Sequence, residues 1–256
     1  MRLRLIRNAT LQLDYAGRRL LVDPMLDPAA ARGPVAGTPN DRPNPLVELP
    51  EPAEAIVAGV DALIVTHLHA DHLDDTAVAL LAGSLPVLAQ PPDVDALHER
   101  GFTDVRPVDD ALDFDGVQVI RTGGQHGTGR LAEALAPVSG FVLRAEGEPV
   151  LYIAGDTIWC ADVRAVLDEL APDVVVVNAG GARFTEGDPI VMTAEDVVAV
   201  ARHAPAAHVV AVHLEAINHC LETREELQAR LREDGLEERV SVPADGAGVP
   251  LASTGR

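Results

Sequence analysis

The segment from Ala62 to His72 constrains this chain more than any other part of it. A short apolar run, Ala62 to Val65, is followed directly by Thr-His-Leu-His-Ala-Asp-His. Side chains two positions apart on an extended strand end point the same way, so His67 and His69 aim at one point. Asp71 and His72 lie on the turn that follows and can face a second point. Since imidazole and carboxylate groups hold divalent metals such as zinc, this peptide predicts ligands for two metal ions.

Three further ligand-type residues follow apolar, strand-like runs later in the chain: His126, Asp156 and His213. His126 lies within the glycine-rich segment Gly123 to Gly129, and glycine permits a tight loop close to a site. Taken alone, each residue also suits a turn, a helix cap or a structural role. Because all three stand near the carboxyl end of a strand-like run, we expect them to meet the first cluster. His219 is a competing candidate for the last ligand.

The first sixty residues predict short strands and one long irregular segment. The strand-like runs are Leu3–Ile6, Thr10–Leu13 and Arg19–Val22. Asp14 to Gly17 predicts a hairpin turn between the second and third runs. The Pro-rich segment from Asp23 to Pro52 is too long for an ordinary connection, and such loops are usually functional or disordered. We expect it to be an ordered excursion beside a site.

From Asp61 onwards the pattern changes to strands that alternate with helices. The expected strands are Ala62–Val65, Pro86–Ala89, Val117–Arg121, Gly140–Arg144, Val150–Ile153, Val174–Val177 and His208–Val212. The expected helices are Thr76–Leu81, capped by Asp74 or Asp75, and Asp93–Arg100, Val163–Leu170, Ala194–Arg202 and Glu222–Arg232. This order is typical of two packed sheets with helices outside. We therefore expect an α/β (α+β) fold, a four-layer αββα sandwich, with residues 1–256 in a single domain.

Charge and cysteine content limit the partners and the compartment. The chain has 40 acidic and 20 basic residues, all of the latter Arg, for a formal net charge of -20. Such a surface repels phosphate backbones and anionic lipid, so we expect no nucleic-acid and no membrane partner. We find no secretory signal and no membrane-spanning apolar run, and Cys160 and Cys220 are too few for a disulfide framework. We expect a cytoplasmic protein with a small-molecule substrate, while its oligomeric state is left open.

The sequence Thr66 to His72, together with the later single His and Asp positions, resembles the metallo-β-lactamase-fold hydrolase superfamily. Leu21-Val-Asp-Pro24 is also similar to the amino-terminal strands of the branch that contains ascorbate-6-phosphate lactonase. The resemblance implies the four-layer sandwich and two metal sites bridged by Asp156. The implied ligands are His67, His69 and His126 for the first metal, and Asp71, His72 and His213 for the second.

The resemblance also implies a chemistry. Two divalent ions, zinc with manganese or iron as alternatives, lower the pKa of a shared water, and the metal-bridged hydroxide attacks a small lactone, ester or phosphodiester. Asp71 is the expected catalytic residue, because it can accept the water's proton and pass it to the leaving group. Asn178, Glu215 and His219 are the candidate substrate contacts. Asp156 disfavours β-lactam hydrolysis, since antibiotic-degrading members of the superfamily lack a bridging carboxylate.

Two alternatives stay open. Related mononuclear iron dioxygenases keep the same histidine-rich element but do not need Asp71, His72 and His213 together as ligands. His69 also argues against the oxygen-reducing members, which carry Glu at the second His position. The other alternative is a non-catalytic metal-binding scaffold.

Overall fold

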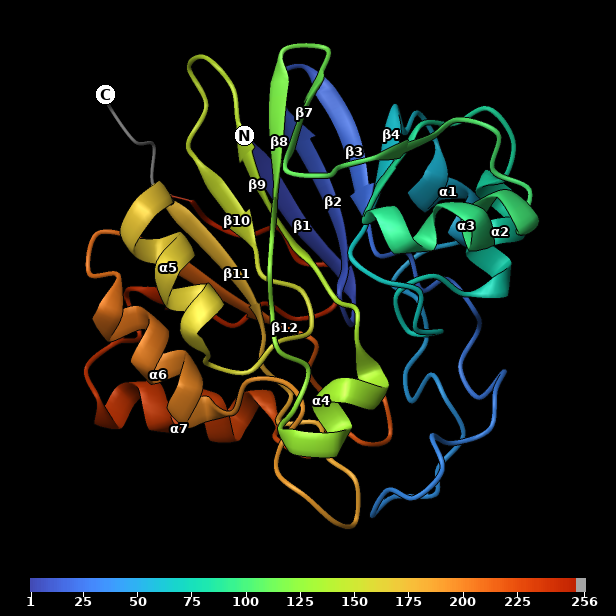
Figure 1. Ribbon diagram of the computed structural model, residues 1–256. Coiled ribbons are helices and arrows are strands. Elements are labelled where there is room, and N and C mark those ends of the chain that lie inside the picture. The colour runs from blue at the N-terminus through green and yellow to red at the C-terminus, as the bar shows by residue number, and fades with distance from the viewer. Residues whose placement is uncertain (252–256) are drawn as a thin grey trace.

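The computed structural model describes residues 1–251 and contains two mixed β-sheets between two layers of helices (Figure 1). The six-stranded sheet has the order β1 (Arg2–Arg7), β2 (Thr10–Tyr15), β3 (Arg18–Val22), β4 (Ala62–Val65), β5 (Val87–Ala89) and β6 (Val105–Pro107). The seven-stranded sheet has the order β13 (Val240–Ser241), β12 (His208–Val212), β11 (Val174–Asn178), β10 (Leu151–Ile153), β9 (Gly140–Arg144), β8 (Val117–Thr122) and β7 (Ala111–Phe114).

Both sheets follow the same plan. Each begins with antiparallel strands, β1 to β3 in one and β7 to β10 in the other, and continues with parallel strands. In the second sheet β8, β10, β11 and β12 therefore run in the same direction. Their carboxyl ends lie at one edge, where ligands bind in α/β sheets.

The helices cover the outer faces of the sheets. In Figure 1, α1 (Ala53–Val57), α2 (Asp75–Leu81) and α3 (Val94–Glu99, preceded by the 3₁₀ turn Pro91–Asp93) lie on one side, beside β4. On the other side lie α5 (Ala161–Leu170), α6 (Ala194–His203) and α7 (Arg224–Glu233). The short α4 (Gly129–Leu135) lies at the lower end of the view, as does the Pro-rich segment. These layers confirm the expected αββα sandwich.

Side chains along the central strands point alternately to two different cores, which explains why those strands are apolar throughout. In β4, Ala62 and Ile64 pack into the core between the sheets, whereas Leu63 and Val65 pack into the core under α1 to α3. In β11, successive valines alternate in the same way between the central core and the core under α5 to α7. Both faces of such a strand are buried, so a continuous apolar run replaces the apolar–polar alternation of a half-exposed strand.

Some element boundaries differ from the predictions. The last helix begins at Arg224 and not at Glu222, because the Thr223 side chain accepts from the Glu226 backbone N–H and caps it. Five elements were not predicted: α1, β6, β7, α4 and β13. Within residues 1–251, no helix is both long enough and apolar enough to cross a bilayer.

One buried side chain, Asn218, holds the middle of the Pro-rich segment against the rest of the chain. Asn218 accepts hydrogen bonds from the Val35 backbone (3.0 Å) and the Asn44 amide (2.7 Å), and it donates to Thr38 Oγ1 (2.7 Å) and the Asn40 carbonyl (2.5 Å). The segment is therefore an ordered excursion, as its length and composition predicted.

Candidate metal centre

The predicted ligands lie together because they follow the carboxyl ends of neighbouring strands. The residues after β4 meet those after β8, β10 and β12 at one edge of the sandwich. The structure brings together all seven predicted ligands: His67, His69, Asp71, His72, His126, Asp156 and His213. They form two groups that share Asp156, and within each group the potential ligand atoms lie within 4.8 Å of one another.

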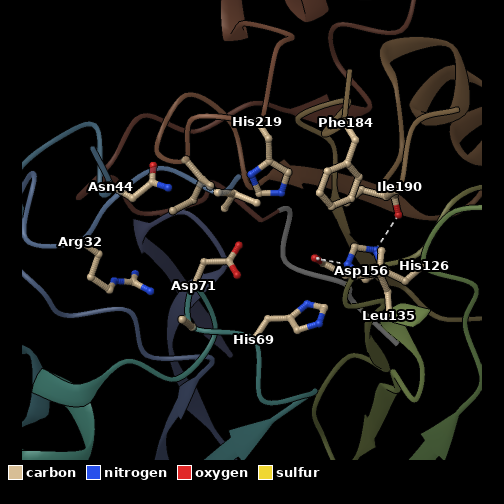
Figure 2. Close-up of a pocket in the computed structure, with 13 residues that line it drawn as sticks. Arg32, Asn44, His69, Asp71, His126, Leu135, Asp156, Phe184, Ile190 and His219 are labelled. Carbon is tan, nitrogen blue, oxygen red and sulfur yellow. Dashed lines mark hydrogen bonds and ion pairs between the residues drawn. The ribbon is translucent and has the colours of Figure 1, made fainter. Parts of the chain in front are cut away.

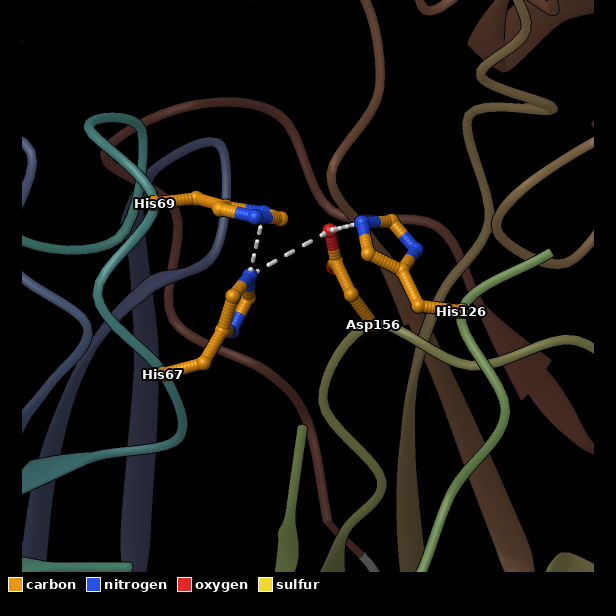
Figure 3. A group of neighbouring side chains, drawn as sticks. All are labelled: His67, His69, His126 and Asp156. Carbon is orange, nitrogen blue, oxygen red and sulfur yellow. Dashed lines mark hydrogen bonds and ion pairs between the residues drawn. The ribbon is translucent and has the colours of Figure 1, made fainter. Parts of the chain in front are cut away.

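The first group contains His67, His69, His126 and Asp156 (Figure 3). The Nε2 atom of His67 lies 2.9 Å from Nδ1 of His69. The Oδ2 atom of Asp156 lies 3.9 Å from Nε2 of His67 and 3.5 Å from Nε2 of His126. All these atoms converge on one point between the three rings.

The second group contains Asp71, His72, His213 and the same Asp156. Here Asp156 presents its other oxygen, Oδ1, which lies 3.3 Å from Nε2 of His72 and 3.7 Å from Nε2 of His213. The Oδ2 atom of Asp71 lies 3.2 Å from Nε2 of His213. The two carboxylate oxygens of Asp156 thus face different groups.

Hydrogen bonds on the far side of the rings set the orientation of three imidazoles. The Nδ1 atom of His126 lies 2.7 Å from the Ile190 carbonyl, and Nδ1 of His72 lies 2.8 Å from the Asp23 carboxylate. The Nδ1 atom of His67 lies 3.0 Å from the Thr66 hydroxyl. In the neutral ring, an acceptor at Nδ1 holds the ring proton there, so that the lone pair of Nε2 is directed into the centre.

Electrostatics keep the acidic groups of the centre ionised. Burial alone would raise the pKa of Asp71 and Asp156, but the surrounding imidazoles, His72 foremost, hold the pKa of both carboxyls well below the usual range. Burial lowers the pKa of His67 well below its ordinary value, so this ring is neutral at physiological pH.

The two histidines of the second group behave differently. Burial alone would lower the pKa of His72 and His213. The Asp156 carboxylate and its neighbours raise the pKa of His72 well above its ordinary value, and Cys220 followed by Asp156 do so for His213. In the absence of a metal, these rings therefore hold protons in the place that a cation would take.

The donor set fits divalent cations. Nε2 of His67 and Nδ1 of His69 lie 2.9 Å apart, so these two ring nitrogens face the same point. The Nε2 atom of His72 is buried and has no hydrogen-bond partner among residues 1–251. Buried polar atoms are normally paired, and imidazole nitrogens with carboxylate oxygens are the usual ligands of zinc, manganese and iron.

A cavity of about 240 Å³ opens onto the centre (Figure 2). His69, Asp71, His126 and Asp156 contribute to its wall. Its other lining residues are Arg32, Val35, Asn44, Ala70, Leu135, Phe184, Ile190, Ile217 and His219. Most of this remaining surface is apolar, and the Pro-rich segment provides three of its residues.

The three predicted substrate contacts have different positions. His219 lines the cavity, as expected. Asn178 lies outside the lining and donates a 2.6 Å hydrogen bond to Oδ1 of Asp156, so it orients a predicted ligand. Glu215 also lies outside the lining, because its carboxylate is ion-paired with Arg224 at the start of α7. Contact of Asn178, Glu215 and His219 with substrate stays a prediction.

Asp23 and Arg32 were missed by the sequence interpretation. Asp23 accepts from the Thr66 backbone (2.8 Å) and hydroxyl (2.7 Å) as well as contacting His72, and its backbone φ of 44° lies in the left-handed region. A signal for Asp23 was present, since it directly follows the third strand. No sequence signal indicated Arg32, because it lies within an irregular segment.

Comparison with known proteins identifies the family. Residues 18–214 of the 256 match the family described as the β-lactamase superfamily domain, so the chain belongs to this superfamily, in the metallo-β-lactamase fold. UPF0173 protein YddR of Bacillus subtilis is 38% identical over 247 residues, which cover 94% of this chain and 96% of that protein.

Two solved structures are similar over nearly their whole length. The isothiocyanate hydrolase from Delia radicum gut bacteria is 38% identical, with a TM-score of 0.94 over 98% of this chain and 99% of that one. A possible metal-dependent hydrolase from Veillonella parvula is 33% identical, with a TM-score of 0.95 and the same coverage, 98% and 99%. The chain is therefore a metal-dependent hydrolase, as the sequence predicted. Membership of the ascorbate-6-phosphate lactonase branch stays a prediction.

Proposed function

We propose that this hydrolase uses a dinuclear metal centre to hydrolyse a small, neutral electrophile with an apolar substituent, and that isothiocyanates are its substrate class. One observation carries the dinuclear part. Asp156 turns Oδ2 toward His67 and His126 and Oδ1 toward His72 and His213, which is the arrangement that a bridging carboxylate requires.

The protein's own residues prepare the reaction. When bound, two divalent ions lower the pKa of a water molecule toward neutrality and polarise the electrophile. We propose zinc, with manganese or iron as alternatives, held by the seven ligands. Asp71 both lines the cavity and lies in the second group, so its carboxylate stands where it can accept the water's proton.

The shape and polarity of the cavity support a small apolar substrate. Leu135, Phe184, Ile190 and Ile217 offer surface to an alkyl or aryl group. An isothiocyanate, R–N=C=S, consumes one water and yields the amine R–NH₂ and carbonyl sulfide. The likeness to an isothiocyanate hydrolase at 38% identity supports this class ahead of lactones and esters. A phosphodiester is disfavoured, since Arg32 is the one cationic side chain in the lining and the chain carries a net charge of -20.

His219 is proposed to contact the substrate. Its ring lines the cavity, and its buried Nδ1 atom has no hydrogen-bond partner within the described residues. Burial lowers the pKa of His219, so the ring is neutral and can donate through one nitrogen while it accepts through the other.

The rival functions would leave part of this geometry unused. A mononuclear iron dioxygenase needs one group of ligands, whereas Asp71, His72 and His213 complete a second. A non-catalytic scaffold does not need a cavity beside its metals.

Cys160 and Cys220 are both buried and free of disulfide, which supports our proposal of a cytoplasmic location.

The test combines metal analysis with a substrate panel. The protein is purified without added metal, its metal content is measured by plasma mass spectrometry, and turnover is assayed with added zinc or manganese. The panel contains benzyl and phenethyl isothiocyanate, activated esters, lactones and a phosphodiester. We expect two equivalents of metal and release of amine and carbonyl sulfide from the isothiocyanates. One iron with oxygen uptake would favour the dioxygenase, and no turnover of any compound would favour the scaffold.

A further inference from the structure

The polar side chains Arg32 and Asn44 lie on one side of the cavity, across the predicted ligands from Leu135 and Ile190. Figure 2 shows Arg32 and Asn44 on one side of Asp71, and Leu135 and Ile190 on the opposite side, beyond Asp156. A molecule whose reacting carbon lies over the metal ligands therefore extends an apolar group toward one end and a polar terminus toward the other.

Arg32 is held rigidly on its side of the cavity. Its backbone exchanges two hydrogen bonds of 2.8 Å with the backbone of Asn44. Its Nε atom forms an ion pair of 2.8 Å with Oδ2 of Asp27, a buried carboxylate that also accepts from the Thr76 hydroxyl at 2.6 Å. Because both the backbone and the Nε atom of Arg32 are held in place, its side chain loses little conformational entropy when it binds a ligand.

The same guanidinium has buried donor nitrogens that form no hydrogen bond. Both Nε, despite its ion pair with Asp27, and Nη2 of Arg32 are buried without a hydrogen-bond partner within residues 1–251. The neighbouring Asn44 offers no such donor, because its amide donates to Asn218 Oδ1 at 2.7 Å and its oxygen accepts from the Asn218 backbone at 2.8 Å. A buried, unpaired cationic donor in a cavity wall is costly unless a ligand atom completes it.

We propose that Arg32 is the residue that binds the terminal sulfur of the substrate and stabilises the negative charge that develops there. This assignment rests on the proposed function. In the addition step the water oxygen forms a bond to the central carbon, the π electron pair of the C=S bond moves to sulfur, and the water proton passes to Asp71. That proton then passes from Asp71 to nitrogen as the C=N π pair moves there and sulfur re-forms the C=S bond. The remaining hydroxyl proton also passes to nitrogen, the C–N bond breaks with its electron pair on nitrogen, the oxygen forms the C=O bond, and R–NH₂ and carbonyl sulfide separate. Arg32 thus acts on the reacting atoms opposite the apolar substituent.

The first test compares Arg32→Gln with Arg42→Gln. Arg42 lies on the same Pro-rich segment but is exposed and absent from the cavity wall, which makes it a matched control. Loss of a preorganised donor to a developing anion costs about 100-fold in kcat. We expect that loss in Arg32→Gln with benzyl isothiocyanate, an unchanged metal content and a KM changed far less than kcat. Arg32→Lys, which keeps the charge without the fork, should recover part of kcat. Wild-type kcat in Arg32→Gln would overturn the assignment.

The second test does not depend on turnover. Thiocyanate has the same linear N–C–S skeleton with a full negative charge, and its binding to the metal-loaded protein is measured by calorimetry. We expect Arg32→Gln to bind it about tenfold more weakly, and Arg42→Gln to bind it as the wild type does. Equal affinities in all three proteins would refute the role of Arg32. If the wild type hydrolyses no isothiocyanate, the proposed substrate class fails, while this titration still decides whether Arg32 binds the anion.

Discussion

Replacement of Asp156 by asparagine separates the two groups of ligands. The substitution keeps the size of the side chain but replaces one of its two oxygens with an NH₂ group. Asn178 donates to Oδ1 of Asp156 at 2.6 Å, so the new carbonyl oxygen should occupy the Oδ1 position. The reverse orientation would bring two amide donors together in a buried place, which costs about 1–3 kcal/mol. The first orientation is therefore favoured by about 5-fold to 150-fold.

The consequence for metal content follows from which group each oxygen faces. The Oδ1 position faces His72 (3.3 Å), while the Oδ2 position faces His126 (3.5 Å). An NH₂ group cannot bind a cation, so Asp156→Asn should lose the ion of the first group and keep that of the second. We expect the metal content to fall from about two equivalents to about one.

Plasma mass spectrometry with two double variants identifies the ion that remains. Adding His126→Ala to Asp156→Asn should not lower the metal content further, whereas adding His213→Ala should remove the remaining ion. Asp168→Asn is the matched control, because Asp168 lies at the surface, paired with His203, and that variant should keep the full metal content. Retention of both ions in Asp156→Asn, or loss of the second-group ion first, would refute the bridging geometry.

Three other predictions concern the ligands and the Pro-rich segment. His69→Ala should lower the metal content by at least one equivalent and abolish hydrolysis; full metal content with an unchanged rate would count against the site. Because the metal-free pKa of His72 and His213 is raised, the ion of the second group must displace protons there, so the affinity for that ion should rise with pH through neutrality, by up to tenfold per pH unit for each proton; a flat competition titration with a chelator would contradict this. Asn218→Ala should lower the free energy of unfolding by about 3 kcal/mol and expose residues 35–44 to protease, and an unchanged denaturation curve would show that this side chain does not hold that part of the segment.

Several elements could be predicted because their signals are local. The strand from Ala62 to Val65 and the helix from Ala194 to His203 show in the apolar pattern of their own residues. By contrast, α4 contains no buried residue and begins at Gly129, so neither its pattern nor its first residue indicates a helix. The two strands β6 and β13 are three and two residues long, and only pairing with a neighbour distinguishes them from loop.

The sequence by itself determined the kinds of ligand and their order, since each predicted ligand stands at the end of a strand that its own neighbours specify. The tertiary structure decided the tasks of the surrounding polar residues. Asn178 orients Asp156, Glu215 pairs with Arg224, and Arg32 lines the cavity. These roles depend on contacts between segments that are far apart along the chain or on the packing around a cavity, and such contacts exist only after the two sheets have come together.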